Sequence, residues 1–418
     1  MFSSSAPAAR ILVVSLDAYR FSTRSRKAAL QYRLVAPTTF LGLSGAGRTG
    51  RWDEPIDAVV DDVHIKQIYV KKPWVAANRR SQIRNLFVSY LPALVRMAGV
   101  VFSTPADVVH VTGTPLALLG LLHRARFGSF MVLDVQERPG VGSKGSLTSI
   151  FSVVELSLLR YASRHVDVAT VVTHGDVDTV AALGFQTVEL IRNAPLSTWR
   201  APYEPPPGAQ AGGLGVVVIG SIFEGRGFEI LLRALAKAKL QQDICLRIYG
   251  PGREDYVTSL KGLTESLGVS DSVEWMGVVD SSEVSAAYLG AQIGLVLYEM
   301  ADPGNDGLSN KMLECVSSGR PVIAGDLPEN RRFITENHIG WLTDVTVDGL
   351  ASVLAIVGVD EDLAALSARC RKCGDTWLNW ETEFSTLLTL VESRATKRAE
   401  SIRYQGETAL ADSQGIPM

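Results

Sequence analysis

Short runs rich in valine, isoleucine and leucine recur along this chain, and the gaps between most of them leave room for a helix. A run that is apolar throughout is typical of a parallel strand whose sheet is covered by helices on both faces. The first series lies at 11–16, 35–40, 108–111, 130–133, 168–172 and 188–191, and the second at 215–219, 244–249, 273–276, 293–297, 321–324 and 340–342. The sequence therefore predicts an α/β protein in which a doubly wound parallel sheet occurs twice.

The chain of 418 residues is long enough for two α/β domains of ordinary size. Between the two series, residues 200–213 are rich in proline and glycine, which favour neither a helix nor an inner strand. We place the N-terminal domain at 1–200 and the C-terminal domain at 201–395. We expect the last helices, around 376–394, to pack back on the N-terminal domain, and the polar residues 396–418 to form a poorly ordered tail.

The composition excludes several classes of protein. A formal net charge of -3 gives no overall field that would gather nucleic acid. Four cysteines without a secretory leader fit a reducing compartment, so we expect a cytoplasmic protein. Cys370 and Cys373 form a CxxC pair, but one pair supplies only two of the four ligands that zinc prefers, and we expect no metal and no cofactor. No apolar run has the length of a membrane span, and we expect the apolar segments 91–102 and 116–122 to be buried helices.

A basic segment lies at 66–84, where cationic residues from Lys66 to Arg84 surround Tyr69 and Trp74. One interpretation is a solvated surface. The other is a patch that brings the N-terminal domain to an anionic membrane, at the inner face of the cell membrane. A lipid-linked acceptor would suit the second interpretation.

Two glycine-rich turns follow predicted strands of the C-terminal domain. The first begins with Gly220 and Ser221 and leads into an amphipathic helix, and the second contains Gly250 and Gly252. Glycine lets the backbone approach a ligand closely, and the start of a helix offers free N–H groups to an anion. Ligands bind outside the carboxyl ends of parallel strands, so we expect both turns to line one crevice. Packing of helix against strand is the alternative reason for these glycines.

An acidic pair marks the segment that precedes the strand at 321–324. A polar loop leads into a predicted helix at 308–317, with Asp306 at its entrance and Glu314 about two turns further on, on nearly the same face. Asp306 can bind a ligand or simply cap the helix. Glu314 lies among apolar residues and needs a partner or a ligand. Lys311 is either a solvated charge or a counter-ion for a diphosphate.

These motifs follow one another in a recognisable order, with Gly-x5-Arg-Gly at 220–227, Ile-Tyr-Gly-Pro-Gly at 248–252, Asp-x7-Glu at 306–314 and Gly-Arg-Pro-Val-Ile-Ala at 319–324. The order resembles that of family 4 (group 1) glycosyltransferases of the GT-B fold. The resemblance is strong over the C-terminal domain and weak over the N-terminal one. It implies two Rossmann-like domains that face a central cleft, with the donor nucleotide held by the C-terminal domain and the acceptor by the N-terminal one.

The resemblance also implies roles for individual residues. Glu314 corresponds to the glutamate that holds the ribose, Asp306 to the acidic residue that faces the donor sugar, and Arg226 to the basic residue that neutralises the diphosphate. The stretch expected to bind the diphosphate comprises Gly307, Leu308, Ser309, Asn310 and Lys311. The first glycine turn and the base and ribose pocket are expected to comprise Gly220, Ser221, Gly250, Gly252 and Val278.

Two positions depart from the family pattern. Ser221 stands where the family often has an arginine, and Gln136 stands where many members have a histidine after the fourth N-terminal strand. Arg20 or Arg24, after the first strand, could supply the missing positive charge. With Gln136 at the position of that histidine, we expect the catalytic set to comprise Asp306, Arg226, Lys311 and Gln136.

The function implied by the resemblance is that of a retaining glycosyltransferase, which moves a sugar from a nucleoside-diphosphate sugar to a hydroxyl of a glycan, a lipid-linked or a small-molecule acceptor. Arg226, Lys311 and helix amides would stabilise the departing diphosphate, with no metal. The alternatives are a sugar-nucleotide epimerase or phosphorylase of the same fold, and a scaffold that binds nucleotide sugars without turnover.

Overall fold

The computed structural model describes residues 9–19, 22–44, 57–71, 79–136, 146–206, 213–280, 283–297, 308–357 and 362–394. The chain divides into two compact units. Unit 1 comprises Met1–Ile191 together with Phe384–Met418, and unit 2 comprises Arg192–Glu383. The predicted tail at 396–418 lies outside the described residues.

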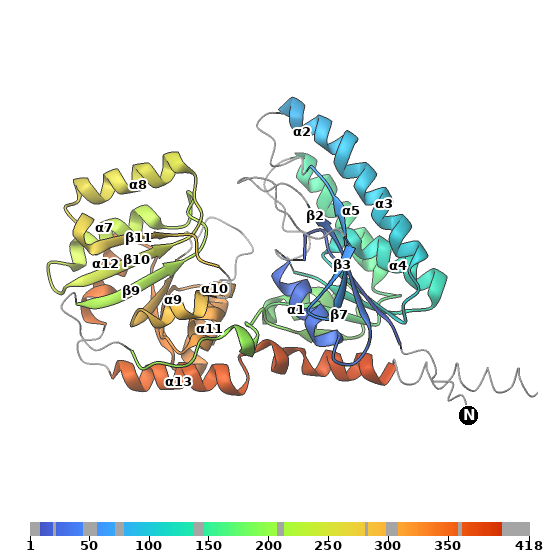
Figure 1. Cartoon of the computed structure of the whole chain (residues 1–418). Helices are drawn as coiled ribbons and strands as arrows, with labels where there is room; N and C mark the ends of the chain where they lie inside the picture. The colour runs from blue at the N-terminus through green and yellow to red at the C-terminus, as the bar shows by residue number, and fades with distance from the viewer. Residues whose placement is uncertain are drawn as a thin grey trace, which may run out of the picture. The chain divides into compact units, whose positions relative to one another are not determined.

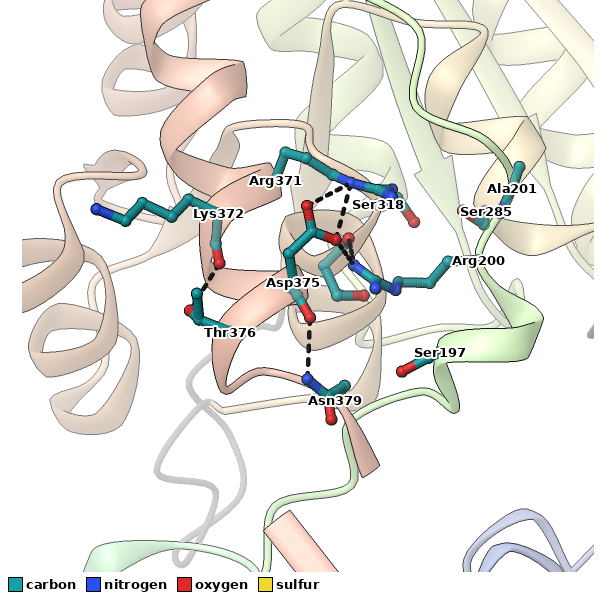
Figure 2. Close-up of polar contacts among 12 residues, drawn as sticks. Ser197, Arg200, Ala201, Ser285, Ser318, Arg371, Lys372, Asp375, Thr376 and Asn379 are labelled. Carbon is teal, nitrogen blue, oxygen red and sulfur yellow. Dashed lines mark hydrogen bonds and ion pairs between the residues drawn. The ribbon is translucent and has the colours of Figure 1, made fainter. Parts of the chain in front are cut away.

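The chain first crosses from unit 1 to unit 2 between Ile191 and Arg192, whereas the sequence predicted a domain boundary between residues 200 and 201. Polar contacts within unit 2 explain the difference. The backbone N–H of Arg192 donates to Glu383 over 3.0 Å, and its guanidinium donates to the same carboxylate over 2.7 Å. Further along, Asp375 accepts from Arg200 and Arg371, as Figure 2 shows. These ion pairs attach residues 192–200 to the last part of unit 2.

Unit 1 contains a sheet of order β3-β4-β2-β1-β5-β6-β7-β8. All neighbouring pairs are parallel except β3 and β4, which are antiparallel. The strands are β1 Ile11–Val14, β2 Thr38–Ser44, β3 Asp57–Val60, β4 Val63–Tyr69, β5 Val108–Thr112, β6 Phe130–Asp134, β7 Val168–Val171 and β8 Val188–Leu190. The run at 35–40 was thus placed too early, and β3 and β4 were not predicted.

Helices cover the sheet of unit 1. They are α1 Thr23–Tyr32, α2 Arg79–Asn85, a π-helical turn Leu86–Tyr90, α3 Leu91–Ser103, a 3-10 turn Thr114–Leu116, α4 Ala117–Phe127, α5 Ser146–Ala162 and α6 His174–Ala181. Side chains of α3, α4 and α5 pack on one face of the sheet, where Met97, Ala117 and Leu159 join its core (Figure 1). The last helix, 380–394, reaches unit 1 at Phe384, whose ring lies edge-on to Tyr32 of α1.

The expectation that 91–102 and 116–122 form buried helices was wrong. Only one side of α3 is buried, and large apolar side chains on α3 and α4 are exposed to solvent. Within the described residues, the segment Leu86–Ser103 is long and apolar enough to cross a membrane by length and composition alone, with a mean hydropathy of 1.7. Periodicity missed this exposure because the helix is apolar on both sides, which is usual for buried helices.

Unit 2 contains a sheet of order β11-β10-β9-β12-β13-β14, in which every pair is parallel. Its strands are β9 Leu214–Ile219, β10 Ile244–Tyr249, β11 Val273–Gly277, β12 Ile293–Val296, β13 Val322–Gly325 and β14 Gly340–Thr343. Each overlaps a predicted run of the second series. The predicted fold class, α/β with two Rossmann-like parallel sheets, is confirmed.

The helices of unit 2 lie on both faces of its sheet. They are α7 Phe228–Ala238, α8 Glu254–Ser266, α9 Val284–Leu289, α10 Asn310–Ser318, α11 Pro328–Asn337, α12 Val347–Ile356 and α13 Leu363–Thr376, with 3-10 turns at Ser197–Trp199 and Ser270–Ser272. Leu231 and Leu235 of α7 are four residues apart and bury one stripe against the sheet, in the same core as Leu350 of α12. Met312 and Val316 of α10 do the same on the opposite face.

Candidate functional site

A cavity of about 350 Å³ lies in unit 2 at the carboxyl ends of β9 and β12. These strands are neighbours in the sheet although β10 and β11 lie between them in the chain, so the cavity occupies the point where the strand order reverses. Its lining residues are Val218, Ile219, Gly220, Ser221, Arg226, Phe228, Leu231, Leu295, Val296, Leu297, Ser309, Asn310 and Lys311. The starts of α7 and α10 both contribute to this lining, and each helix start carries a partial positive charge. The cavity is therefore suited to an anionic ligand.

The turn before α7 is shaped by its glycines. Gly227 immediately precedes the helix and has a φ of 77°. This backbone conformation is energetically unfavourable for any residue that carries a side chain. This left-handed residue turns the chain so that Arg226 lies in the cavity wall. The Arg226 guanidinium also lies over the ring of Phe223, 4.5 Å from its centroid. A half-buried cation is thus held at the start of α7.

The second glycine turn, after β10, lies directly against the first. A Cβ at Gly250 would stand 1.7 Å from the carbonyl oxygen of Gly220, so no other residue fits there without a backbone shift. Gly252 and Ile222 form a parallel bridge that continues the pairing of the two strands. The two turns therefore lie together, but Gly250 and Gly252 are not among the residues that line the cavity, so one crevice shared by both turns stays a prediction. Val278, at the end of β11, is 74% exposed.

The start of α10 is capped by Ser309, whose hydroxyl accepts the backbone N–H of Met312. The capping role that the sequence allowed for Asp306 thus belongs to Ser309. Asp306 and Gly307 lie outside the described residues. Leu308 is half-buried and packs on the core beside α10. The helix ends at Ser318 and is followed by Gly319 in the left-handed conformation, one residue beyond the predicted end at 317.

Lys311 and Glu314 form an ion pair across one turn of α10, with 2.9 Å between Nζ and Oε2. Lys311 also lines the cavity, and its backbone carbonyl accepts from the hydroxyl of Tyr288. Glu314 therefore has the partner that its apolar neighbours required. The pair holds a cation at the cavity wall and places a carboxylate next to it.

Gln136 lies in unit 1, just after β6, and its amide donates to Asp134 over 3.1 Å. Asp134 is buried in a tight pair with Arg24, and the Arg24 guanidinium also donates to the carbonyl of Ile191. Burial alone would raise the pKa of Asp134, but the charge and hydrogen bonds of Arg24 hold it below its ordinary value. Arg24 is thus buried and paired within unit 1, and Arg20 lies outside the described residues.

Buried polar groups surround this pair. Thr170 donates to Asp134, and His110 contacts the hydroxyl of Tyr32 through Nδ1 at 3.0 Å. Nε2 of His110 has no hydrogen-bond partner within the described residues. Burial lowers the pKa of His110 to about 4; Asp134 opposes this change and Arg24 adds to it.

The cysteines Cys315, Cys370 and Cys373 are buried in unit 2, and burial raises the pKa of each thiol. No group of three or more histidine, cysteine or acidic side chains suited to a metal occurs within the described residues.

The structure brings together part of the site that the sequence predicted. The predicted residues that line the cavity are Gly220, Ser221, Arg226, Ser309, Asn310 and Lys311. The apolar part of the wall, which Phe228, Leu231 and 295–297 form, was not predicted from the motifs. The end of the predicted strand at 293–297 carried a usable signal, because strand ends border the ligand site in sheets of this kind.

Comparisons with known proteins also point to unit 2. The family model described as glycosyl transferases group 1 matches residues 213–357. A GDP-mannose-dependent alpha-(1-6)-phosphatidylinositol monomannoside mannosyltransferase of Mycobacterium tuberculosis (strain CDC 1551 / Oshkosh) is 29% identical over 172 residues, which are 40% of this chain and 44% of that protein. A phosphatidyl-myo-inositol mannosyltransferase of Mycobacterium leprae (strain TN) is 26% identical over 191 residues, 44% of this chain and 48% of that protein. The chain thus spans less than half the length of these curated relatives.

Solved structures resemble the chain over almost its whole length. Sucrose-phosphate synthase from Thermosynechococcus elongatus has a TM-score of 0.67 at 14% identity and covers 96% of this chain and 100% of its own. The Anabaena protein HepE in complex with UDP has a TM-score of 0.65 at 12% identity and covers 92% of this chain and 100% of its own. Residues 213–357 thus match the model of the group 1 glycosyltransferases, and the chain as a whole resembles these solved structures in fold.

Proposed function

We propose that this protein is a retaining glycosyltransferase that moves a hexose, with mannose as the first candidate, from a nucleoside-diphosphate sugar to an acceptor hydroxyl. The observation that supports the proposal is the cavity between the starts of α7 and α10, with Arg226 and Lys311 in its wall. Its volume of about 350 Å³ lies within the range of small-molecule sites. GDP-mannose is the first candidate donor because one relative carries it in its name.

In this proposal the diphosphate of the donor lies between the two helix starts. Backbone N–H groups at the start of a helix are free to bind phosphate oxygens, and the helix dipole favours negative charge there. Arg226 and Lys311 add two positive charges in a partly enclosed space. The apolar wall of Phe228 and Leu297 limits the access of water and strengthens these interactions.

The same groups would carry the reaction. As the glycosidic bond loosens, negative charge grows on the leaving diphosphate, and preorganised donors stabilise that charge more than they stabilise the bound substrate. The acceptor hydroxyl would attack from the side of the leaving group and give its proton to the departing phosphate oxygen, so that the configuration of the sugar is retained. Asp306 and Gln136 keep their predicted places in the catalytic set as part of this proposal.

For the acceptor we propose a lipid-linked hydroxyl, in agreement with the phosphatidylinositol named for the relatives. The basic segment 66–84 would bring the N-terminal unit to an anionic membrane surface. Residues 72–78 of it lie outside the described part of the chain, while Lys71, Arg80 and Arg84 are exposed. Each basic residue near such a surface adds about 1 kcal/mol to binding.

The test is a transfer assay with GDP-mannose, UDP-glucose and other common donors against phosphatidylinositol and its mannosides. The variant Arg226→Gln with Lys311→Met is expected to lose about a hundredfold or more in kcat. The matched control is Arg233→Gln, which removes an exposed cation from the same unit. Donor binding without any transfer would favour the scaffold, and isomerised or hydrolysed donor without an acceptor would favour the epimerase. Either result contradicts the proposal.

A further inference from the structure

Helix α3 of unit 1 has an apolar surface that faces solvent. Its inner stripe, Ala93, Met97 and Val101, belongs to the core of unit 1. Its outer stripe is also apolar and comprises Phe87 and Val88 of the preceding turn, Leu91, Val95 and Phe102. These positions recur at the spacing of one helix face. A helix on the surface of a protein in water normally has a polar outer face, so this stripe calls for a partner.

The apolar surface extends over the neighbouring helices. On α4, Leu118 and Leu122 are exposed, and on α5, Val153, Val154 and Tyr161 are exposed. Figure 1 shows these helices on the same side of unit 1, and α4 contacts both α3 and α5. The exposed side chains of α3, α4 and α5 are here called the outer apolar face. Such a face exceeds the scattered apolar residues that any soluble protein exposes.

Charge decides which partner fits this face. Helical residues 79–103 and 117–127 contain no aspartate or glutamate, and α5 contains one acidic residue, the half-buried Glu155. Exposed arginines lie among them, at Arg80, Arg84, Arg96 and Arg126. The Arg126 guanidinium lies 4.3 Å from the centroid of the Phe102 ring, which joins the charged and apolar parts of the face. A second copy of the chain would bring the same arginines together in a symmetric contact, and like charges would oppose it.

We propose that the outer apolar face inserts into the interfacial region of a bilayer rich in anionic lipids. The apolar side chains would lie at the level of the acyl chains, and the arginines would meet the lipid phosphates. Leu86–Ser103 does not cross the membrane in this arrangement, because its inner stripe is part of the core of unit 1. The inference concerns unit 1 alone and does not rest on the donor cavity of unit 2.

The test is flotation of the purified protein with vesicles of phosphatidylcholine, with and without phosphatidylglycerol. The variant Val88→Asp with Val95→Asp changes side chains that are 73% and 72% exposed, so its fold is expected to be kept. Transfer of each valine side chain from water into the bilayer contributes about 1.5 kcal/mol of binding free energy, which is about tenfold in the partition coefficient. The double variant is therefore expected to bind vesicles at least about a hundredfold more weakly. Leu240→Asp with Ile356→Asp, exposed in unit 2, is the matched control and is expected to bind like the wild type.

A second variant separates charge from insertion. Arg84→Gln with Arg96→Gln is expected to lose about fivefold per arginine on phosphatidylglycerol vesicles, and little on phosphatidylcholine alone. Flotation of Val88→Asp with Val95→Asp equal to that of the wild type overturns the proposal, as does a wild type that binds neither kind of vesicle. A wild-type dimer that this variant dissociates, without vesicle binding, assigns the face to self-association instead. Calorimetric binding of GDP and UDP by the variant is expected to be unchanged, which keeps this test apart from that of the donor site.

Discussion

The ion pair between Lys311 and Glu314 provides a sharp test of what the donor site does. If Glu314 holds the ribose, its carboxylate accepts hydrogen bonds from two ribose hydroxyls, and Glu314→Gln removes the charge of that carboxylate. Hydrogen bonds to a charged group contribute about 1.5–3 kcal/mol each, so the loss is expected to be about 3 kcal/mol, or about a hundredfold in Kd. If Glu314 only positions Lys311, the loss is much smaller. The pair is 32% and 25% exposed, and partly screened pairs contribute about 0–1 kcal/mol, which is less than about sixfold.

Isothermal titration calorimetry of GDP and UDP with the wild type, Glu314→Gln, Lys311→Met and the double variant measures both terms and their coupling. We expect Glu314→Gln alone to weaken binding about a hundredfold, and the double variant to show nearly the sum of the two losses. Two results together would refute the ribose role: a Kd of Glu314→Gln within about sixfold of the wild type, and clearly weaker nucleotide binding by Lys311→Met. Glu314 would then be a positioning residue for Lys311.

Further predictions follow from the buried parts of both units. Because the pKa of His110 is lowered to about 4, its neutral form stabilises the fold fully above about pH 6.5, and this contribution is lost as the pH falls toward 4. Denaturant titration of the wild type is expected to show about 2 kcal/mol less unfolding free energy at about pH 5 than at about pH 7, and His110→Phe is expected to lack that part of the difference. Arg320 is fully buried and donates mainly to backbone carbonyls, those of Leu289 and Ala291 among them. Arg320→Lys is expected to destabilise unit 2 by about 3 kcal/mol, because an ammonium leaves several of these carbonyls unpaired, and a loss under about 1 kcal/mol in urea unfolding would contradict this. Gly250→Ala is expected to cost about 3 kcal/mol or more, whereas Gly262→Ala on α8, where a Cβ meets nothing, is expected to stabilise by up to about 1 kcal/mol; equal melting temperatures for the two would contradict the close approach.

The sheet of unit 2 could be predicted because its strands are buried on both faces and appear as continuous apolar runs. Ile244–Tyr249, for example, was predicted with its observed bounds. The strands β3 and β4 were missed because β3 forms the edge of the sheet and β4, next to it, is only half-buried on one face. In β4, buried Val63 and Ile65 alternate with half-buried His64 and Lys66, a period of two without a continuous run.

The candidate site was predicted in its local parts only. The turns at Gly220 and Gly250 and the start of α10 follow from short-range patterns. The pairing of Arg24 with Asp134 joins residues that are 110 positions apart, and no spacing rule reveals such a contact. The exposure of Val88 and Val95 was equally hidden, because an apolar helix is expected to be buried until its neighbours are known.

The proposed function depends most directly on nucleotide binding in the cavity of unit 2. The measurement that tests it is the melting temperature of the wild type and of Arg226→Gln with Lys311→Met, with and without GDP, UDP and ADP. A ligand at about a hundred times its Kd stabilises the folded state by about 2.7 kcal/mol, so a bound nucleoside diphosphate is readily detected. We expect the melting temperature of the wild type to rise with GDP or another of these nucleotides, and we expect the double variant to lack this rise. No rise with any nucleotide, or a rise that the variant keeps in full, would contradict the proposed function.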